Sequence, residues 1–401
     1  MSAELYQANH PSRFWRPLIT PEPDTTEWDA AIRSAAAALP YLARAAGDGI
    51  DSLLEATLGE GQFGARHWRL SLIRRTYYLL KPFLPRAAVI HGRRRAGARA
   101  QLGFPLGWPI EDRYRRFLWD AVGQVMALYG RTEMPFIFFW PFGARYTLVL
   151  THDVETADGQ GFVPRVADLE ERLGFRSSFN FVAERYQLDH GLLRDLVARG
   201  FEVGVHGRRH DGRELRSRRV FERHARHINE HLRRLGAVGF RSPLTHRHPE
   251  WMQSLEVEYD ASFFDSDPFE PMPGGTMSLW PFTMGRFLEL PYTLAQDFTL
   301  VDVLEERQPR LWLEKTAYLR RFCGMALLNA HPDYLRERCH QRMYAAFLDQ
   351  LSGDPTCWNA PPRDVARWWR RRAAAESVGD LPDARAGLVR KDSAGETEVV
   401  P

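Results

Sequence analysis

Between residues 146 and 372, short β-rich runs alternate with helical patterns, and this alternation constrains the fold more than any other feature of the chain. Strand patterns occur at 146–150, 176–182, 201–205, 237–240, 287–290 and 325–329, and helical patterns at 190–199 and 214–235. Such alternation predicts parallel strands in an α/β barrel or an open sheet. In either architecture, the chemistry lies at the carboxyl ends of the strands.

The sequence on either side of this α/β segment has a different character. Residues 1–145 have helical apolar periods interrupted by prolines, and we expect a mainly helical accessory region there. Residues 373–401 are rich in Gly, Ala, Asp and Glu with few apolar side chains, which predicts a disordered tail. The predicted parts are therefore a helical region (1–145), an α/β domain (146–372) and a tail (373–401).

Two segments of the helical region leave alternatives open. Residues 91–100 carry four arginines, which we interpret as a solvated loop, although such a cluster can also bind an anionic polymer or lipid head groups. The apolar run at 77–85 is broken by two prolines. Contact with a membrane surface is a secondary interpretation of both segments, after plain packing against the rest of the protein.

Composition and charge exclude several classes of protein. A net charge of +3 over 401 residues gives little reason to expect nucleic-acid binding. No uninterrupted apolar run reaches the roughly 18 residues of a membrane span, and the N-terminus lacks the pattern of a secretory signal, so we expect a cytoplasmic protein. Three cysteines without CxxC spacing argue against a disulfide framework or a thiolate zinc site.

Ionisable side chains follow four of the predicted strands, at the point where each strand ends. They are Asp153 and Glu155, His206 and His210, Arg241, and His331. On a helical turn, two histidines four residues apart face the same side and can share a metal ion. In extended backbone, two carboxylates two residues apart lie on one face, so that one can bind the metal while the other acts as a base.

Each of these patterns is weak when taken alone. Fourteen histidines make chance pairs common, and an Asp after a strand is often a turn residue. His331 alone is explained equally well as a histidine of the core or of a loop. Their combination in one order along the chain is much stronger. Two imidazoles and one carboxylate, with open positions for water, indicate a catalytic metal site of a hydrolase.

From about residue 145 to 335, the chain resembles the polysaccharide deacetylase family, carbohydrate esterase family four, in its D-x-D/E subgroup. The segment LTHDVE resembles the family's first motif, which implies that Asp153 is the base and Glu155 a metal ligand. The residue between them leaves these two roles exchangeable. The second motif implies that His206 and His210 are the other ligands.

The third motif is matched by Arg241-Ser-Pro, whose arginine holds the base in this family, although Leu244 follows where an aromatic residue is common. The late motif is resembled by Leu328-Asn-Ala-His331 and implies that His331 is the general acid. Asp297 is our first candidate for the carboxylate that orients this histidine, and Asp267 is the second. The resemblance implies a distorted (β/α) barrel.

The implied activity is that of a metal-dependent hydrolase, with zinc as the expected ion and a carbohydrate as the partner. It would remove an N-acetyl group from an amino sugar in a polysaccharide, an oligosaccharide or a lipid-linked glycan. A related C–N hydrolase acting on a non-sugar amide and a non-catalytic glycan-binding protein are the alternatives. Loop 259–275 is expected near the site, and four aromatic residues are candidates either for stacking on sugar or for the core: Trp280, Phe282, Tyr292 and Phe298.

Overall fold

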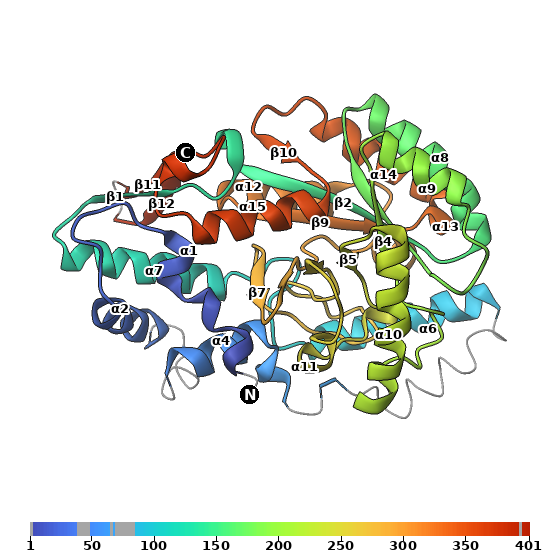
Figure 1. Cartoon of the computed structure of the whole chain (residues 1–401), viewed down its shortest axis with the longest axis horizontal. Coiled ribbons are helices and arrows are strands. Elements are labelled where there is room, and N and C mark those ends of the chain that lie inside the picture. Colours follow the sequence, from blue (N-terminus) through green and yellow to red (C-terminus); the bar gives the residue numbers. More distant parts are fainter. Residues whose placement is uncertain (1–2, 38–48, 65–66, 69–84, 393–394) are drawn as a thin grey trace.

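The fold is described from a computed structural model (Figure 1), which describes residues 3–37, 49–64, 67–68, 85–392 and 395–401. Most of the apolar run at 77–85 lies outside these residues. Within the described part of the chain, no helix is both long enough and apolar enough to cross a membrane.

A nine-stranded sheet forms the centre of the molecule. Its order is β10-β2-β3-β4-β5-β6-β8-β7, with β9 paired to β2, and every pairing is parallel except that of β7 with β8. The strands are β2 (Tyr146–Val154), β3 (Ser177–Phe181), β4 (Glu202–Val205), β5 (Gly239–Phe240), β6 (Tyr259–Asp260), β7 (Phe282–Met284), β8 (Phe287–Glu289), β9 (Met325–Ala330) and β10 (Cys357–Asn359). All nine residues of β2 are buried, as expected for the central strand of a parallel sheet.

Main-chain hydrogen bonds beyond β8 bring the curled sheet back towards β9. The N–H groups of Thr293 and Leu294 both donate to the carbonyl oxygen of Leu327, at 3.3 and 3.1 Å. The hydroxyl of Thr293 also donates to the carbonyl of Met325 at 2.7 Å. The prediction of a distorted (β/α) barrel is thereby confirmed.

Helices surround the barrel and also build the N-terminal region (Figure 1). The helices around the barrel are α8 (Ala157–Arg172), α9 (His190–Ala198), α10 (Arg218–Leu235), α11 (Pro249–Met252), α12 (Arg310–Arg321), α13 (Pro332–Leu335), α14 (Arg338–Leu351) and α15 (Pro362–Ala374), with a π-helix, η7 (Thr299–Val303). Those of the N-terminal region are α1 (Pro11–Trp15), α2 (Thr25–Ala37), α4 (Ile50–Leu58), α6 (Arg86–Leu102) and α7 (Arg113–Leu128).

The N-terminal helices share one hydrophobic core with the barrel. Trp119 of α7 stacks on Trp280 with ring centroids 5.5 Å apart, and both indoles are buried. A fully buried ion pair also joins the two regions, because both oxygens of Glu60 accept hydrogen bonds from the Arg247 guanidinium at 2.7 and 2.9 Å. The region is therefore packed as part of the same body as the barrel.

Two segments differ from the sequence predictions. The tail is not disordered throughout, because β11 (Ala386–Lys391) pairs with β12 (Thr397–Val400) and with β1 (Glu133–Ile137). Successive side chains of a strand point to opposite faces, so that Val389 and Val399 are buried while Leu388 and Val400 are only partly buried. The arginine-rich segment 91–100 is part of helix α6 and not a loop, since no residue from 86 to 102 is a proline and alanines and arginines favour a helix.

Candidate active site

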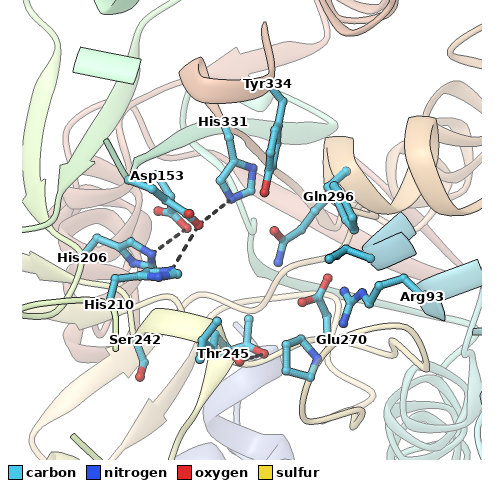
Figure 2. Close-up of a pocket in the computed structure, with 15 residues that line it drawn as sticks. Arg93, Asp153, His206, His210, Ser242, Thr245, Glu270, Gln296, His331 and Tyr334 are labelled. Atoms are coloured by element: carbon cyan, nitrogen blue, oxygen red, sulfur yellow. Dashed lines mark hydrogen bonds and ion pairs between the residues drawn. The ribbon is translucent and has the colours of Figure 1, made fainter. Parts of the chain in front are cut away.

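A pocket opens at the carboxyl ends of the barrel strands (Figure 2). Five of the seven predicted site residues line it: Asp153, Glu155, His206, His210 and His331. The other two, Arg241 and Asp297, lie directly behind these residues and contact them. The barrel topology thus brings together side chains that are up to 178 residues apart in the sequence.

Glu155, His206 and His210 form a compact group that lines the pocket. Figure 2 shows the two histidines close together at one end of it. One ligand atom from each lies within 4.8 Å of the others. The Nε2 atom of His210 is 3.1 Å from Oε1 of Glu155. Burial raises the pKa of Glu155, but His210, His331 and His206 outweigh this effect and hold the pKa well below its usual value.

The two histidines are brought together by a loop and not by the helical turn that their spacing suggested. Gly207 and His210 both have left-handed backbone, with φ of 62° and 56°. A Cβ atom on Gly207 would lie 2.3 Å from Cγ of Pro243, so only glycine fits against this proline. The carbonyl of Arg241 lies 3.1 Å from Nδ1 of His206 and orients the ring so that Nε2 faces the pocket.

This group satisfies the chemical requirements of a divalent metal site. A carboxylate and two imidazoles are the ligand set of catalytic zinc sites, which leave further positions for water or substrate. A histidine binds a metal ion through a neutral imidazole. Burial lowers the pKa of His206 to about 4 and so keeps its ring neutral. We therefore take Glu155, His206 and His210 as the candidate ligands.

Asp153 lies beside the candidate ligands, 3.8 Å from Nε2 of His206. Its carboxylate accepts hydrogen bonds from the side-chain amides of Asn180 at 3.2 Å and Asn329 at 3.0 Å. Nη1 of Arg241 is 3.5 Å away. Burial raises the pKa of Asp153, but His206, Arg241 and other neighbours outweigh burial and hold the pKa below its usual value. The carboxylate is therefore ionised at neutral pH.

Arg241 is fixed in place by contacts other than Asp153. Its side chain is buried, donating from Nε to the carbonyl of Ala261 and from Nη1 to the hydroxyl of Thr151, both at 2.8 Å. The guanidinium lies over the ring of Tyr292, 4.2 Å from its centroid. A buried cation held in this way favours the ionised form of the neighbouring carboxylate.

His331 faces the same pocket, with Nε2 3.9 Å from Oε1 of Glu155. Asp297 holds the opposite side of its ring, since Oδ1 is 2.7 Å from Nδ1 and Oδ2 accepts the main-chain N–H of His331 at 2.8 Å. Burial lowers the pKa of His331, but Asp297, Glu155 and Asp153 outweigh it and raise the pKa to about 10. The imidazole is therefore protonated at neutral pH.

The remaining predicted residues are placed differently. Asp267 accepts the N–H of Phe269 at 2.6 Å, whereas Asp297 is the aspartate that contacts His331. Of the four aromatic candidates, Phe298 lines the pocket, while Trp280, Phe282 and Tyr292 are buried in the core. Loop 259–275 does reach the site, through Glu270 and the following proline.

Sequence reasoning missed several polar residues of the site: Arg93, Asn180, Glu270, Gln296, Asn329 and Tyr334. Two of them had a detectable signal. Asn180 lies directly opposite Asp153 in the β2–β3 register, and Asn329 lies opposite Thr151 in the β2–β9 register. A correct alignment of neighbouring strands would have placed both amides beside the carboxylate.

No protein-family model and no curated protein matches the chain. Solved structures do match. A protein of Mycobacterium smegmatis assigned to the polysaccharide deacetylases has a TM-score of 0.47 and 17% identity, over 58% of this chain and 93% of the other. The allantoinase PuuE has a TM-score of 0.46 and 17% identity, over 58% and 92%. The peptidoglycan deacetylase PdaC of Bacillus subtilis has a TM-score of 0.39 and 12% identity, over 57% and 94%.

These likenesses are to polysaccharide deacetylases and an allantoinase at the level of the fold, and the D-x-D/E subgroup remains a prediction. The interpretation of the site therefore depends on its own geometry.

Proposed function

We propose that this protein is a metal-dependent hydrolase that removes an N-acetyl group from an amino sugar. The observation that carries the proposal is a carboxylate and an imidazole that line one pocket beside the candidate metal ligands. Asp153 lies 3.8 Å from Nε2 of His206, and Nε2 of His331 lies 3.9 Å from Oε1 of Glu155. Hydrolysis of an amide requires a base for the attacking water and an acid for the departing amine.

Glu155, His206 and His210 would hold the metal ion, with zinc as the expected ion. A bound ion of this kind acidifies water and polarises the amide carbonyl. Asp153 would accept the proton of the attacking water. Arg241, Asn180 and Asn329 contact this carboxylate and would hold it in place.

His331 would donate its proton to the nitrogen as the C–N bond breaks. One water is consumed, its oxygen forms the new bond to the acyl carbon, and the products are acetate and a free amine. Asp297 supports this step because its carboxylate fixes the ring and favours the protonated form. An amine is a poor leaving group, so this proton transfer is essential to the reaction.

A carbohydrate is the proposed substrate, on the strength of the sequence motifs and of the lining of the pocket. Donors and acceptors dominate this lining, which suits a hydroxylated ring better than an apolar one. Phe298 and Tyr334 add two aromatic rings, with centroids 5.4 Å apart, against which a sugar face can pack.

The test is acetate release from N-acetylglucosamine oligomers by the Zn²⁺-loaded protein and by its His206→Ala variant. We expect release by the wild-type protein and none above background by the variant. Metal content is measured on the same samples. Metal binding without acetate release would favour a non-sugar amide or a glycan-binding role, and equal release by both proteins would contradict the proposed site.

A further inference from the structure

A second cleft lies away from the candidate active site, where the N-terminal region meets the barrel. Residues of α1, α7 and α15, together with β7 and the chain before it, line this cleft (Figure 1). None of the described residues that line it also lines the pocket of Asp153 and His331. Among the described residues, no Asp or Glu lines the cleft, whereas two arginines do, Arg13 and Arg372. The lining thus carries positive charge that no lining carboxylate offsets.

Arg372 of α15 is unusual among the buried arginines of the protein. In the part of the chain that the structure describes, three arginines are fully buried: Arg241, Arg247 and Arg372. Arg247 pairs with Glu60 at 2.7 Å, and the nearest carboxylate to Arg241 belongs to Asp153 at 3.5 Å. Arg372 forms no ion pair with any carboxylate of the described residues. Its charge is therefore buried without an opposite charge beside it.

Main-chain carbonyl groups accept most of the hydrogen bonds that Arg372 can donate. Nε donates to the carbonyls of Ile137 at 3.1 Å and Phe138 at 3.0 Å. Nη2 donates to those of Ile137 at 2.7 Å and Phe14 at 2.8 Å, while Nη1 donates to no described residue. Burial and the nearby Arg16 lower the pKa of Arg372 to about 9, so the guanidinium is charged at neutral pH. Carbonyl dipoles leave this charge uncompensated, and a buried charge without a counter-ion is costly.

Two further donors from other helices line the same cleft. Arg13 of α1 is exposed and forms no ion pair with the residues that the structure describes. Tyr114 of α7 is only 3% exposed, and its hydroxyl makes no hydrogen bond within the described part of the chain. Burial raises the pKa of Tyr114, so this hydroxyl stays protonated and can donate. Three helices thus bring donor side chains to one cleft.

This combination of side chains selects an anion. Arg13 and Arg372 supply two positive charges with N–H donors, and Tyr114 supplies an O–H donor. Guanidinium groups bind the oxygen atoms of phosphate and carboxylate groups through strong, charge-assisted hydrogen bonds. A cation would be repelled, and a neutral ligand would leave the charge of Arg372 without a counter-ion.

We propose that this cleft is a second binding site of the protein, and that its ligand is a small oxyanion with a phosphate or a carboxylate group. Arg13 and Arg372 balance the charge of the anion, and Tyr114 donates a further hydrogen bond to it. The bound anion links α1 and α7 of the N-terminal region to α15 of the barrel. The site does not depend on the reaction proposed for the barrel pocket.

The first experiment is isothermal titration calorimetry of the full chain with inorganic phosphate and with acetate, at an ionic strength kept constant with sodium chloride. We expect saturable binding of one anion per chain. Tighter binding of phosphate than of acetate would assign a phosphate ligand, and the reverse order would assign a carboxylate. Absence of saturable binding of both anions at millimolar concentrations would overturn the proposal.

Variants then place the bound anion in the cleft. Arg13→Ala and Tyr114→Phe should each weaken binding about threefold to tenfold, because each removes one hydrogen bond to the anion. Tyr114→Phe keeps the ring and removes a hydroxyl that bonds to no described residue, so the variant should fold. Arg33→Ala is the matched control, since Arg33 is an exposed arginine of α2 that does not line the cleft. Equal affinities in all three variants would overturn the site.

A further control separates this cleft from the candidate active site, where an anion can also bind beside a metal ion. His206→Ala removes a candidate metal ligand and should bind the anion with wild-type affinity. Loss of anion binding in His206→Ala would place the anion in the barrel pocket and overturn the proposal. Because the readout is binding and not acetate release, the second site can be confirmed even if the proposed function fails.

Discussion

Two buried groups of charged residues in this protein differ in how completely their members are paired. Glu60 and Arg247 form a closed pair, with both carboxylate oxygens bonded to the guanidinium and no exposed surface on either side chain. Asp153 and its neighbours form an open group that lines a pocket. The closest contact of Asp153 with Arg241 there is 3.5 Å, longer than a hydrogen bond.

This difference separates a structural role from a chemical one. The closed pair joins the N-terminal region to the barrel and has no free atoms with which to bind a ligand. The open group retains ring nitrogens and carboxylate oxygens facing the pocket, and the pKa values of its members are shifted in opposite directions. Perturbed pKa values among side chains that line a pocket are typical of functional sites.

The largest effect is expected from changing the open group. Asp153→Asn keeps the shape of the side chain but removes the base, so kcat for acetate release should fall by about 10²–10⁴. The circular dichroism spectrum should remain that of the wild-type protein. A variant that keeps most of its activity would show that Asp153 is not the base.

Breaking the closed pair should reduce the stability of the protein, whereas changing the open group should reduce its activity. Glu60→Ala leaves Arg247 buried without its partner, which costs about 3–5 kcal/mol in the free energy of unfolding measured with urea. Glu22→Ala, at an exposed position, is the control and should have little effect. Equal unfolding free energies for the two variants would contradict a structural role for the pair.

The pair also predicts a pH dependence of stability. Burial raises the pKa of Glu60, but Arg247 and His67 outweigh it and lower the pKa to about 2, below the usual value near 4.5. The stabilisation is therefore fully present above about pH 4.5 and is lost as the pH falls towards 2. In Glu60→Ala, the free energy of unfolding should therefore fall less between pH 4.5 and pH 2 than it does in the wild-type protein.

A smaller effect is expected from the carboxylate behind the acid. Asp297→Asn should reduce kcat/KM by about 10–100-fold, in line with other carboxylates that orient histidines. His331 is active when protonated, below its pKa of about 10, so losing Asp297 should lower this pKa and move the alkaline limb of the pH profile to lower pH. Asp267→Asn should leave the profile unchanged, and a shift there would reverse the assignment.

The smallest effect is expected from the amides around the base. Asn180→Ala removes one hydrogen bond to Asp153, worth about 0.5–1.5 kcal/mol, so kcat/KM should fall roughly threefold to tenfold. Because this bond favours the ionised carboxylate, the acidic limb of the pH profile should move to higher pH. An unchanged profile would indicate that His206, Arg241 and the other neighbours keep Asp153 ionised without Asn180.

The sequence was sufficient to predict the barrel and the residues at its strand ends, since polar side chains after apolar strands gather at one edge of a parallel sheet. It was not sufficient to predict which residues outside these strands line the pocket or pair with other strands. Arg93 belongs to a segment whose helical structure and place against η7 depend on the tertiary packing of Gly97. The tail was misjudged for a similar reason, because its strands need β1 as a partner.

The central claim is that Glu155, and not Asp153, completes the metal site with the two histidines. The most direct measurement is the Zn²⁺ content of purified Glu155→Gln and Asp153→Asn proteins, each dialysed beside the wild-type protein. We predict one ion per chain in the wild-type protein and in Asp153→Asn, and loss of the ion in Glu155→Gln. Retention by Glu155→Gln together with loss from Asp153→Asn would exchange the two roles, and no bound ion in the wild-type protein would contradict the account as a whole.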